Sequence, residues 1–223
     1  MVKTATVYID GFNLYYGMVE RGWPQYKWLD LYSFAKTIVP AGYKLDYVGY
    51  FTSHIKGDEE KHNRQEKYLN ALRAHIGSNI KFIYGNYQMF PSYCKYCKSE
   101  PVYCRNCGKE VFKSTEKKTD VNISTYMLSD CFENLTDCIV LVSGDSDYDA
   151  PLKEIRRLFP LVQRIIAFPP KRKNSALIGL ADSSFTISED SFANCQLPDP
   201  VRNIKTGKEY YRPDTWVEKI IPM

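Results

Sequence analysis

Residues 138–147 read CIVLVSGDSD, and this stretch decides the fold. Five consecutive apolar residues are typical of a strand that is buried on both faces, as in a parallel sheet. The small residues Ser143 and Gly144 and the acids Asp145 and Asp147 follow at the end of the strand. Residues 4–13, TATVYIDGFN, have the same arrangement, with Asp10 directly after the apolar segment. Two such segments indicate an α/β protein with a mainly parallel central sheet.

Strand and helix patterns alternate along the rest of the chain. Strands are predicted at residues 4–9, 45–52, 80–87, 138–142, 162–168 and 184–187, and helices from about residue 13 and at 29–38, 59–76, 121–132, 151–158 and 175–180. The alternation stops at residues 91–113, which contain four cysteines and little apolar material. We therefore expect one domain at residues 1–192, interrupted by an insertion at 91–113. The proline-containing residues 193–223 are expected to form an extended C-terminal arm.

The composition is that of a globular protein. Apolar residues make up 44% of the 223 residues, which argues against global disorder. Thirty basic and 26 acidic residues give a net charge of +4, which permits a nucleic-acid partner without requiring one. No apolar run reaches the roughly 18 residues of a membrane helix, and the N-terminus lacks the apolar stretch of a signal peptide. We expect a cytoplasmic protein without a membrane partner.

Carboxylates follow the predicted strands at one edge of the sheet. Asp10 ends the first strand, Asp145 and Asp147 follow the strand at 138–142, and Asp120 begins the helix after the insertion. Ligands of open parallel sheets bind beyond the carboxyl ends of the strands. Clustered carboxylates without histidine suit Mg²⁺ or Mn²⁺, which can activate water for phosphodiester hydrolysis. Each acid could instead cap its helix, and Asn13 could do the same.

Two other acids, Asp130 and Asp149, are expected to be a surface residue and a helix cap. Basic side chains gather at three places, and each group is either a solvated surface or a contact for phosphates. These groups are Lys113, Lys117 and Lys118; Lys153, Arg156 and Arg157; and Lys171, Arg172 and Lys173.

Two CxxC pairs, Cys94/Cys97 and Cys104/Cys107, lie six residues apart in the insertion. Two such pairs can complete a tetrahedral, structural zinc site with no open position. Disulfide or redox use is the alternative. Basic and aromatic residues alternate around the cysteines, so the exterior is either a surface for RNA or only a soluble covering. The other three cysteines are Cys131, Cys138 and Cys195, in apolar surroundings.

Three blocks of the sequence resemble the NYN domain family, PIN-like putative ribonucleases. The blocks are residues 7–14 (VYIDGFNL), 116–122 (EKKTDVN) and 141–152 (LVSGDSDYDAPL), in the order of the family. The resemblance covers residues 4 to 190 and implies a PIN-like three-layer α/β fold. It also implies an acidic metal site at Asp10, Asp120, Asp145 and Asp147, with Asn13 as a polar companion. One position departs from the family, because Tyr126 stands where many members have another acid. The site could therefore hold a single metal ion.

The leading hypothesis from the sequence is a Mg²⁺- or Mn²⁺-dependent endoribonuclease that uses metal-activated water. Candidate RNA contacts are Lys118, Lys171, Arg172 and Lys173, and a homodimer is left open. One alternative is a catalytically inactive RNA-binding or adaptor module. Another is a haloacid-dehalogenase-like phosphatase, suggested by the acids of residues 144–149, although its general acid would fall at Phe12, which cannot transfer a proton.

Overall fold

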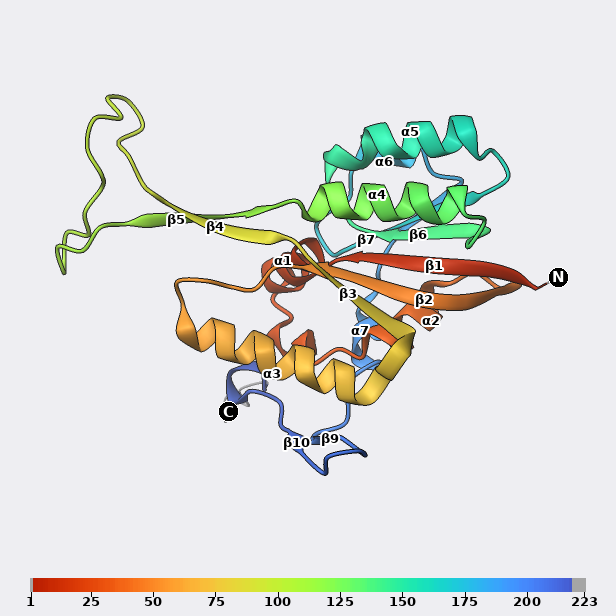
Figure 1. The fold of residues 1–223 in the computed structure, drawn as a ribbon, viewed down its shortest axis with the longest axis horizontal. Helices are drawn as coiled ribbons and strands as arrows, with labels where there is room; N and C mark the ends of the chain where they lie inside the picture. Colours follow the sequence, from red (N-terminus) through yellow and green to blue (C-terminus); the bar gives the residue numbers. More distant parts are fainter. Residues whose placement is uncertain (1, 218–223) are drawn as a thin grey trace.

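A computed structural model describes residues 2–217 of the chain and has a parallel sheet at its centre (Figure 1). Six strands pair in the order β3-β2-β1-β6-β7-β8, and every pair in this sheet is parallel. The strands are β1 (Lys3–Asp10), β2 (Tyr43–Thr52), β3 (Ile80–Tyr84), β6 (Cys138–Val142), β7 (Gln163–Phe168) and β8 (Ser183–Thr186). The predicted α/β class with a mainly parallel sheet is confirmed.

Helices cover both faces of the sheet, which gives three layers (Figure 1). One face packs against α1 (Gly11–Arg21), α2 (Leu31–Ile38), α3 (Glu59–Ile76) and α7 (Glu189–Ala193). The other face packs against α4 (Thr119–Phe132), α5 (Asp149–Leu158) and α6 (Ser175–Ile178). Short 3₁₀ turns are η1 (Pro24–Lys27), η2 (Gly77–Asn79), η3 (Ser146–Tyr148) and η4 (Asp214–Trp216).

Strand β1 explains why the core has two halves. Val7 and Ile9 belong to the apolar cluster below α1, α2 and α3, whereas Tyr8 belongs to the cluster on the α4 and α5 face. Successive side chains of a strand point to opposite faces, so an apolar strand supplies both layers. All five residues of β6 are buried for the same reason.

The order of the strands places a topological switch point between β1 and β6. The chain runs outward from β1 through β2 to β3, and then returns to the other side of β1 with β6, β7 and β8. At such a point the loops after neighbouring strands diverge and leave room for a ligand. The loops after β1 and β6 carry Asp10 and residues 143–147, so the predicted acids lie where the fold favours binding.

The insertion is longer than predicted, because two strands carry it away from the sheet. Strands β4 (Asn86–Pro91) and β5 (Phe112–Lys117) pair antiparallel in a separate ribbon, which projects from the domain (Figure 1). The predicted strand at 80–87 is therefore interrupted at Gly85. A Cβ atom there would lie 2.5 Å from Thr119 Oγ1 and 2.7 Å from Lys117 O, so only glycine fits where the ribbon leaves the domain.

The C-terminal segment packs against the domain, whereas the sequence predicted an extended arm. Strands β9 (Val201–Arg202) and β10 (Glu209–Tyr210) form a small hairpin. The ring of Trp216 lies 6.4 Å from that of Trp28 and 5.8 Å from that of Tyr68. Burial of these aromatic rings favours the folded-back path. The last part of the predicted arm, residues 218–223, lies outside the described residues.

Candidate active site

Asp10 is both a helix cap and a buried member of the acidic site. Its Oδ1 accepts a hydrogen bond from Asn13 N at 2.9 Å and so caps α1. Its Oδ2 accepts from Ser143 Oγ at 3.0 Å and from the hydroxyl of Tyr148 at 3.3 Å. Only 5% of Asp10 is exposed. The capping interpretation is therefore correct for one oxygen, while the second oxygen faces the loop after β6.

Tyr148 connects Asp10 to Asp120. Its hydroxyl lies 3.0 Å from Asp120 Oδ1 as well as 3.3 Å from Asp10 Oδ2. A tyrosine hydroxyl has one proton and can donate it to only one carboxylate at a time. Burial, followed by the charges of Asp10 and Asp120, raises the pKa of Tyr148 far above its usual range, so the hydroxyl stays protonated. One buried donor is thus shared by two acids from distant parts of the chain.

The acids repel one another. Burial raises the pKa of Asp10 from 3.8 to about 6, and the charge of Asp120 adds to this rise against the hydrogen bonds from Asn13, Ser143 and Tyr148. Burial also raises the pKa of Asp120, with further contributions from Asp145 and Asp147. The charge of Asp120 thus acts on Asp10, and the charges of Asp145 and Asp147 act on Asp120, so nearby positive charge would stabilise the ionised forms of Asp10 and Asp120.

Asp145 and Asp147 lie in the turn after β6. Asp145 Oδ1 accepts from Asp147 N at 3.1 Å and caps η3, and Asp145 N donates to Ser143 Oγ at 3.2 Å. Among the side chains that the structure describes (residues 2–217 except 87 and 113–116), no three of His, Cys, Asp or Glu lie close enough together to hold a metal ion. The structure thus brings Asp10 and Asp120 together and leaves Asp145 and Asp147 at the periphery. A cation shared by all four stays a prediction.

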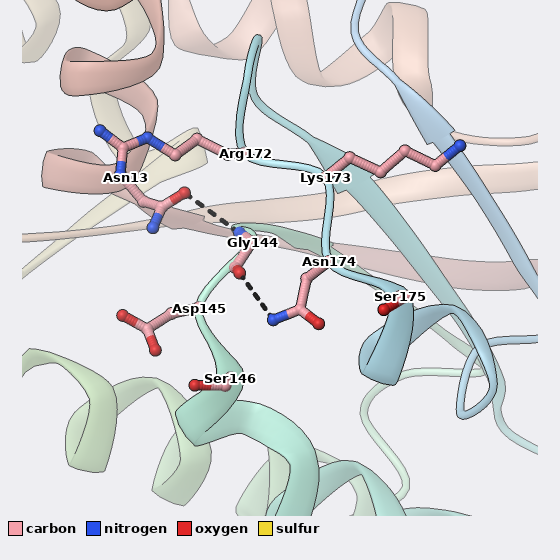
Figure 2. Close-up of a pocket in the computed structure, with 8 residues that line it drawn as sticks. All are labelled: Asn13, Gly144, Asp145, Ser146, Arg172, Lys173, Asn174 and Ser175. Carbon is pink, nitrogen blue, oxygen red and sulfur yellow. Dashed lines mark hydrogen bonds between the residues drawn. The ribbon is translucent and has the colours of Figure 1, made fainter.

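A pocket of about 420 Å³ opens beside Asp145 (Figure 2). Gly144 lies in its wall, where Gly144 N donates to Asn13 Oδ1 and Gly144 O accepts from Asn174 Nδ2, both at 3.1 Å. A Cβ atom on Gly144 would lie 1.7 Å from Arg172 O, so the loops after β6 and β7 meet only because this residue is glycine. Asn13 therefore also holds the backbone that positions Asp145.

Two of the predicted nucleic-acid contacts line this pocket. In Figure 2 the Arg172 side chain extends over Asn13, whereas the Lys173 side chain points away from Asp145. Arg172 also forms an ion pair with Glu20 of α1. Lys171 precedes them in the same loop with φ = 59°, and Lys118 directly precedes α4 with φ = 77°. The basic group in α5 has local partners instead, because Lys153 pairs with Asp149, Arg157 pairs with Glu154, and Arg156 donates to Gly179 O.

The end of the β4–β5 ribbon contains two turns with the same backbone pattern, ten residues apart. Lys98 N donates to Cys94 O at 3.1 Å, and Gly108 N donates to Cys104 O at 2.9 Å. Lys98 and Gly108 both have positive φ, at 53° and 66°. Each CxxC pair thus occupies one tight turn, an arrangement that would suit a pair of metal ligands.

Within each pair the two thiols are hydrogen-bonded neighbours. A hydrogen bond from the Ser99 hydroxyl, 3.3 Å from the sulfur, is the main reason that the pKa of Cys97 falls to about 7. Backbone N–H groups, first that of Asn106, lower the pKa of Cys104. The thiolate is the form that binds metal. Across the described residues the two pairs do not meet in one cluster, so the shared zinc site also stays a prediction.

Ser143 and Tyr148 belong to the site but were not predicted from the sequence, and Asp130, outside the site, lies elsewhere than expected. Ser143 and Tyr148 hold Asp10, and their positions in the loop after a buried strand could have indicated this role. Asp130 was expected at the surface but is buried, where it accepts hydrogen bonds from Tyr8 OH at 2.6 Å and from Tyr47 OH. The expectation for Asp130 was wrong because Tyr8 and Tyr47, from β1 and β2, point into the α4 layer.

The fold and site define an α/β domain of the PIN-like class, with acids at the carboxyl edge of a parallel sheet. Residues 4–189 match the NYN domain, so the chain belongs to the NYN domain family. Membership in this family supports a nuclease-like function. No helix in residues 2–217 is long and apolar enough to cross a membrane.

Two further similarities concern single proteins. The 6-hydroxy-3-succinoylpyridine 3-monooxygenase HspA of Pseudomonas putida is 31% identical over 241 residues, which cover 94% of this chain and 74% of that protein. The crystal structure of a protein of unknown function from Vibrio parahaemolyticus superposes with a TM-score of 0.51 and 14% identity, over 84% of this chain and 94% of that one. The second similarity concerns the fold alone.

Proposed function

We propose that this protein is a metal-dependent nuclease that hydrolyses phosphodiester bonds within RNA. The observation that carries the proposal is the pair of carboxylates at the end of β1 and the start of α4. Asp10 and Asp120 share the Tyr148 hydroxyl, and the pKa of each is raised. A fold that holds acids together in this way gains stability when a cation binds to them.

The donor atoms of the site suit a hard divalent cation. Asp10 and Asp120 would hold it, with Asp145 and Asp147 as further oxygen ligands, and oxygen-only sites favour Mg²⁺ or Mn²⁺. Such an ion lowers the pKa of bound water and stabilises negative charge on a phosphoryl group. Ser143 and Tyr148 keep Asp10 oriented through their hydrogen bonds.

The pocket beside Asp145 supplies the phosphate contacts in this proposal. Arg172 and Lys173 line it, and their positive charges would attract the backbone of RNA to the acidic edge. Lys118, two residues before Asp120, and Lys171 would extend this basic path. Asn13 would orient a phosphate oxygen with its amide nitrogen, since its amide oxygen already accepts from Gly144 N.

In the same proposal, zinc has a structural role in the ribbon. Cys94, Cys97, Cys104 and Cys107 would bind one ion and so hold the two CxxC turns together. The exposed aromatic side chains Tyr93, Tyr96 and Tyr103 lie next to these turns and could stack on RNA bases.

An inactive RNA-binding module remains the main alternative, and Tyr126 is the residue that favours it. Tyr126 lies six residues after Asp120 in α4, is 36% exposed, and has its ring edge-on to that of Phe51, with 5.5 Å between the ring centres. The aromatic ring thus takes the place of an acid that many relatives have. The phosphatase alternative is weaker, because Phe12 lines a pocket between α1 and α3 and has no proton to transfer.

The name of the Pseudomonas relative suggests a second candidate, hydroxylation of a small aromatic acid. The feature that favours it is the same pocket between α1 and α3, which has aromatic walls and the cations Lys27, Lys61 and Arg64. The test is oxygen uptake with 6-hydroxy-3-succinoylpyridine and a two-electron donor. Uptake that depends on the pyridine would support this candidate, and absence of pyridine binding by calorimetry would remove it.

The nuclease proposal is tested with a labelled single-stranded RNA, in Mg²⁺, in Mn²⁺ and in chelator. The wild type should cut internal bonds only with metal, and Asp145→Asn should bind the RNA without cutting it. The neutral amide keeps the shape of the side chain but is a poor ligand for a hard cation. Equal cutting in chelator, or by Asp145→Asn, would show that the mechanism is wrong. RNA binding without any cutting would favour the inactive module.

A further inference from the structure

A second pocket, of about 520 Å³, lies between α1 and α3 on the opposite face of the sheet from Tyr148. Its volume is within the range of about 300–1,000 Å³ that is usual for small-ligand sites. Phe12, Tyr15 and Tyr16 from α1 form one wall, Lys61, Arg64 and Gln65 from α3 form the other, and Tyr50 and Trp216 also line it.

The α1 wall is built of aromatic rings in mutual contact. The ring of Tyr16 lies 5.4 Å from that of Tyr15 in an edge-on arrangement, and 6.2 Å from that of Phe12. Tyr16 is 47% exposed. A flat aromatic ligand could therefore stack on this wall without a rearrangement of the core.

The charges of the pocket favour an anion. Lys27, Lys61 and Arg64 line it, and no Asp or Glu within residues 2–217 is part of its lining. Lys61 and Arg64 pair with Asp58 at 2.9 Å and Glu60 at 3.3 Å, and these acids lie outside the lining. Lys27 has Tyr15 as its partner, with Nζ 3.4 Å from the hydroxyl and 4.8 Å from the centre of the ring. An aromatic ring and three cations in one cavity fit a planar aromatic group that bears a negative charge.

The pocket is continuous with the acidic site along the chain. Its lining begins at Gly11 and Phe12, the two residues between Asp10 and Asn13. Thr52, the last residue of β2, also lines the pocket, so the pocket reaches the carboxyl edge of the sheet, where Asp10 ends β1. A strand of RNA bound along this edge with its scissile phosphate at Asp10 would bring a neighbouring nucleotide toward this pocket.

We propose that the pocket between α1 and α3 binds the base and phosphate of a single-stranded RNA nucleotide next to the bond that is cut. The base stacks on the Tyr16 wall, and Lys27 and Lys61 neutralise the phosphate. Only an unpaired base can enter, because the bases of a duplex are stacked on one another. This inference rests on the proposed nuclease function and adds to it a binding site for one unpaired nucleotide of the substrate.

The test measures binding of 5′-AMP, adenosine and ribose 5-phosphate to the full-length Asp145→Asn protein by calorimetry in chelator. AMP should bind more tightly than either fragment, because only AMP offers both the ring and the charge. Tyr16→Ala and Lys27→Gln should each weaken AMP binding by about tenfold. Lys36→Gln is the matched control, since Lys36 lies 4.3 Å above the ring of Tyr32 in α2, outside the pocket lining, and should bind AMP normally.

Three results would overturn the inference. They are equal affinity for AMP and ribose 5-phosphate, AMP binding unchanged in both pocket variants, and nicotinate bound as tightly as AMP in competition. Nucleotide binding that depends on Tyr16 and Lys27 supports the pocket even if the wild type cuts no RNA, in which case only the nuclease function fails. Conversely, the wild type could cut RNA while the pocket variants bind AMP and cut RNA as well as it does. That result would support the nuclease function and show that the pocket proposal is wrong.

Discussion

Asp10→Asn should make the metal-free protein more stable at neutral pH while it abolishes cleavage. Burial, with a smaller contribution from the charge of Asp120, raises the pKa of Asp10 from 3.8 to about 6 in the folded protein. Each unit of pKa shift corresponds to about 1.4 kcal/mol, so the charged carboxylate costs about 3 kcal/mol of folding free energy above pH 6. The amide loses part of the hydrogen bonding to Ser143 and Tyr148, at about 1 kcal/mol. The net gain should be about 1–2 kcal/mol.

The gain in folding stability from Asp10→Asn should increase as pH rises. A carboxyl with a raised pKa makes the folded state bind more protons than the unfolded state between pH 3.8 and about 6. The stability of the wild type therefore falls as pH rises through this window, and the advantage of Asp10→Asn appears over the same window. Near pH 4 most of the advantage should be lost, because the carboxyl is then protonated in the folded protein and only about half ionised in the unfolded one, and well below this pH it is protonated in both states.

The assay is guanidinium unfolding in chelator, followed by circular dichroism, at pH 4 and pH 7.5. Asp130→Asn is the control, because it makes the same chemical change at a buried acid with two tyrosine donors, Tyr8 and Tyr47. It should destabilise the protein by about 1.5–3 kcal/mol per lost charged hydrogen bond. The reasoning is refuted if Asp10→Asn destabilises at pH 7.5, or if its effect is the same at both pH values.

Three other predictions concern the thiols, the basic loop and the shared hydroxyl. The purified protein should contain about one zinc ion per chain by elemental analysis, and Cys104→Ser should lose it; metal-free wild type would contradict the zinc site. A triple alanine variant of residues 171–173 should reduce the slope of log RNA affinity against log salt concentration by about 2–3 in magnitude. An unchanged slope would show that this loop does not contact RNA. The corresponding variant of the locally paired group in α5 should leave the slope unchanged (Lys153, Arg156, Arg157). Tyr148→Phe removes a donor that lowers the pKa of both Asp10 and Asp120, so the acidic limb of the pH–rate profile should move to higher pH; an unmoved limb would show that the hydroxyl has no such role.

The sheet and most of its helices could be predicted from the sequence because their signals are local. Five apolar residues at 138–142 are buried on both faces, and the helix predicted at 59–76 buries Tyr68, Leu69, Leu72 and Ile76, which recur at helical spacing. The break at Gly85 was not predictable in this way. It depends on a close approach of Thr119 and Lys117, which are more than 30 residues away in the chain.

The site could be predicted in part. The acids follow strands, and the topology brings the ends of β1 and β6 together, so the neighbourhood of Asp10 and residues 143–147 follows from the pattern. The shared Tyr148 hydroxyl and the burial of Asp130 depend on side-chain directions across layers, which periodicity does not encode. The packed C-terminal segment was missed for a related reason, since prolines indicate an extended backbone but not what Trp216 contacts.

The most direct test of the central claim is a crystal structure of the protein with Mn²⁺, recorded at a wavelength where manganese scatters anomalously. An anomalous peak should lie between the carboxylates of Asp10 and Asp120, with oxygen ligands at about 2.1–2.2 Å and Asp145 or Asp147 turned toward the ion. The buried carboxylate of Asp130, with its two tyrosine donors, should show no peak. Mn²⁺ absent from Asp10 and Asp120 at saturating concentration would contradict the account.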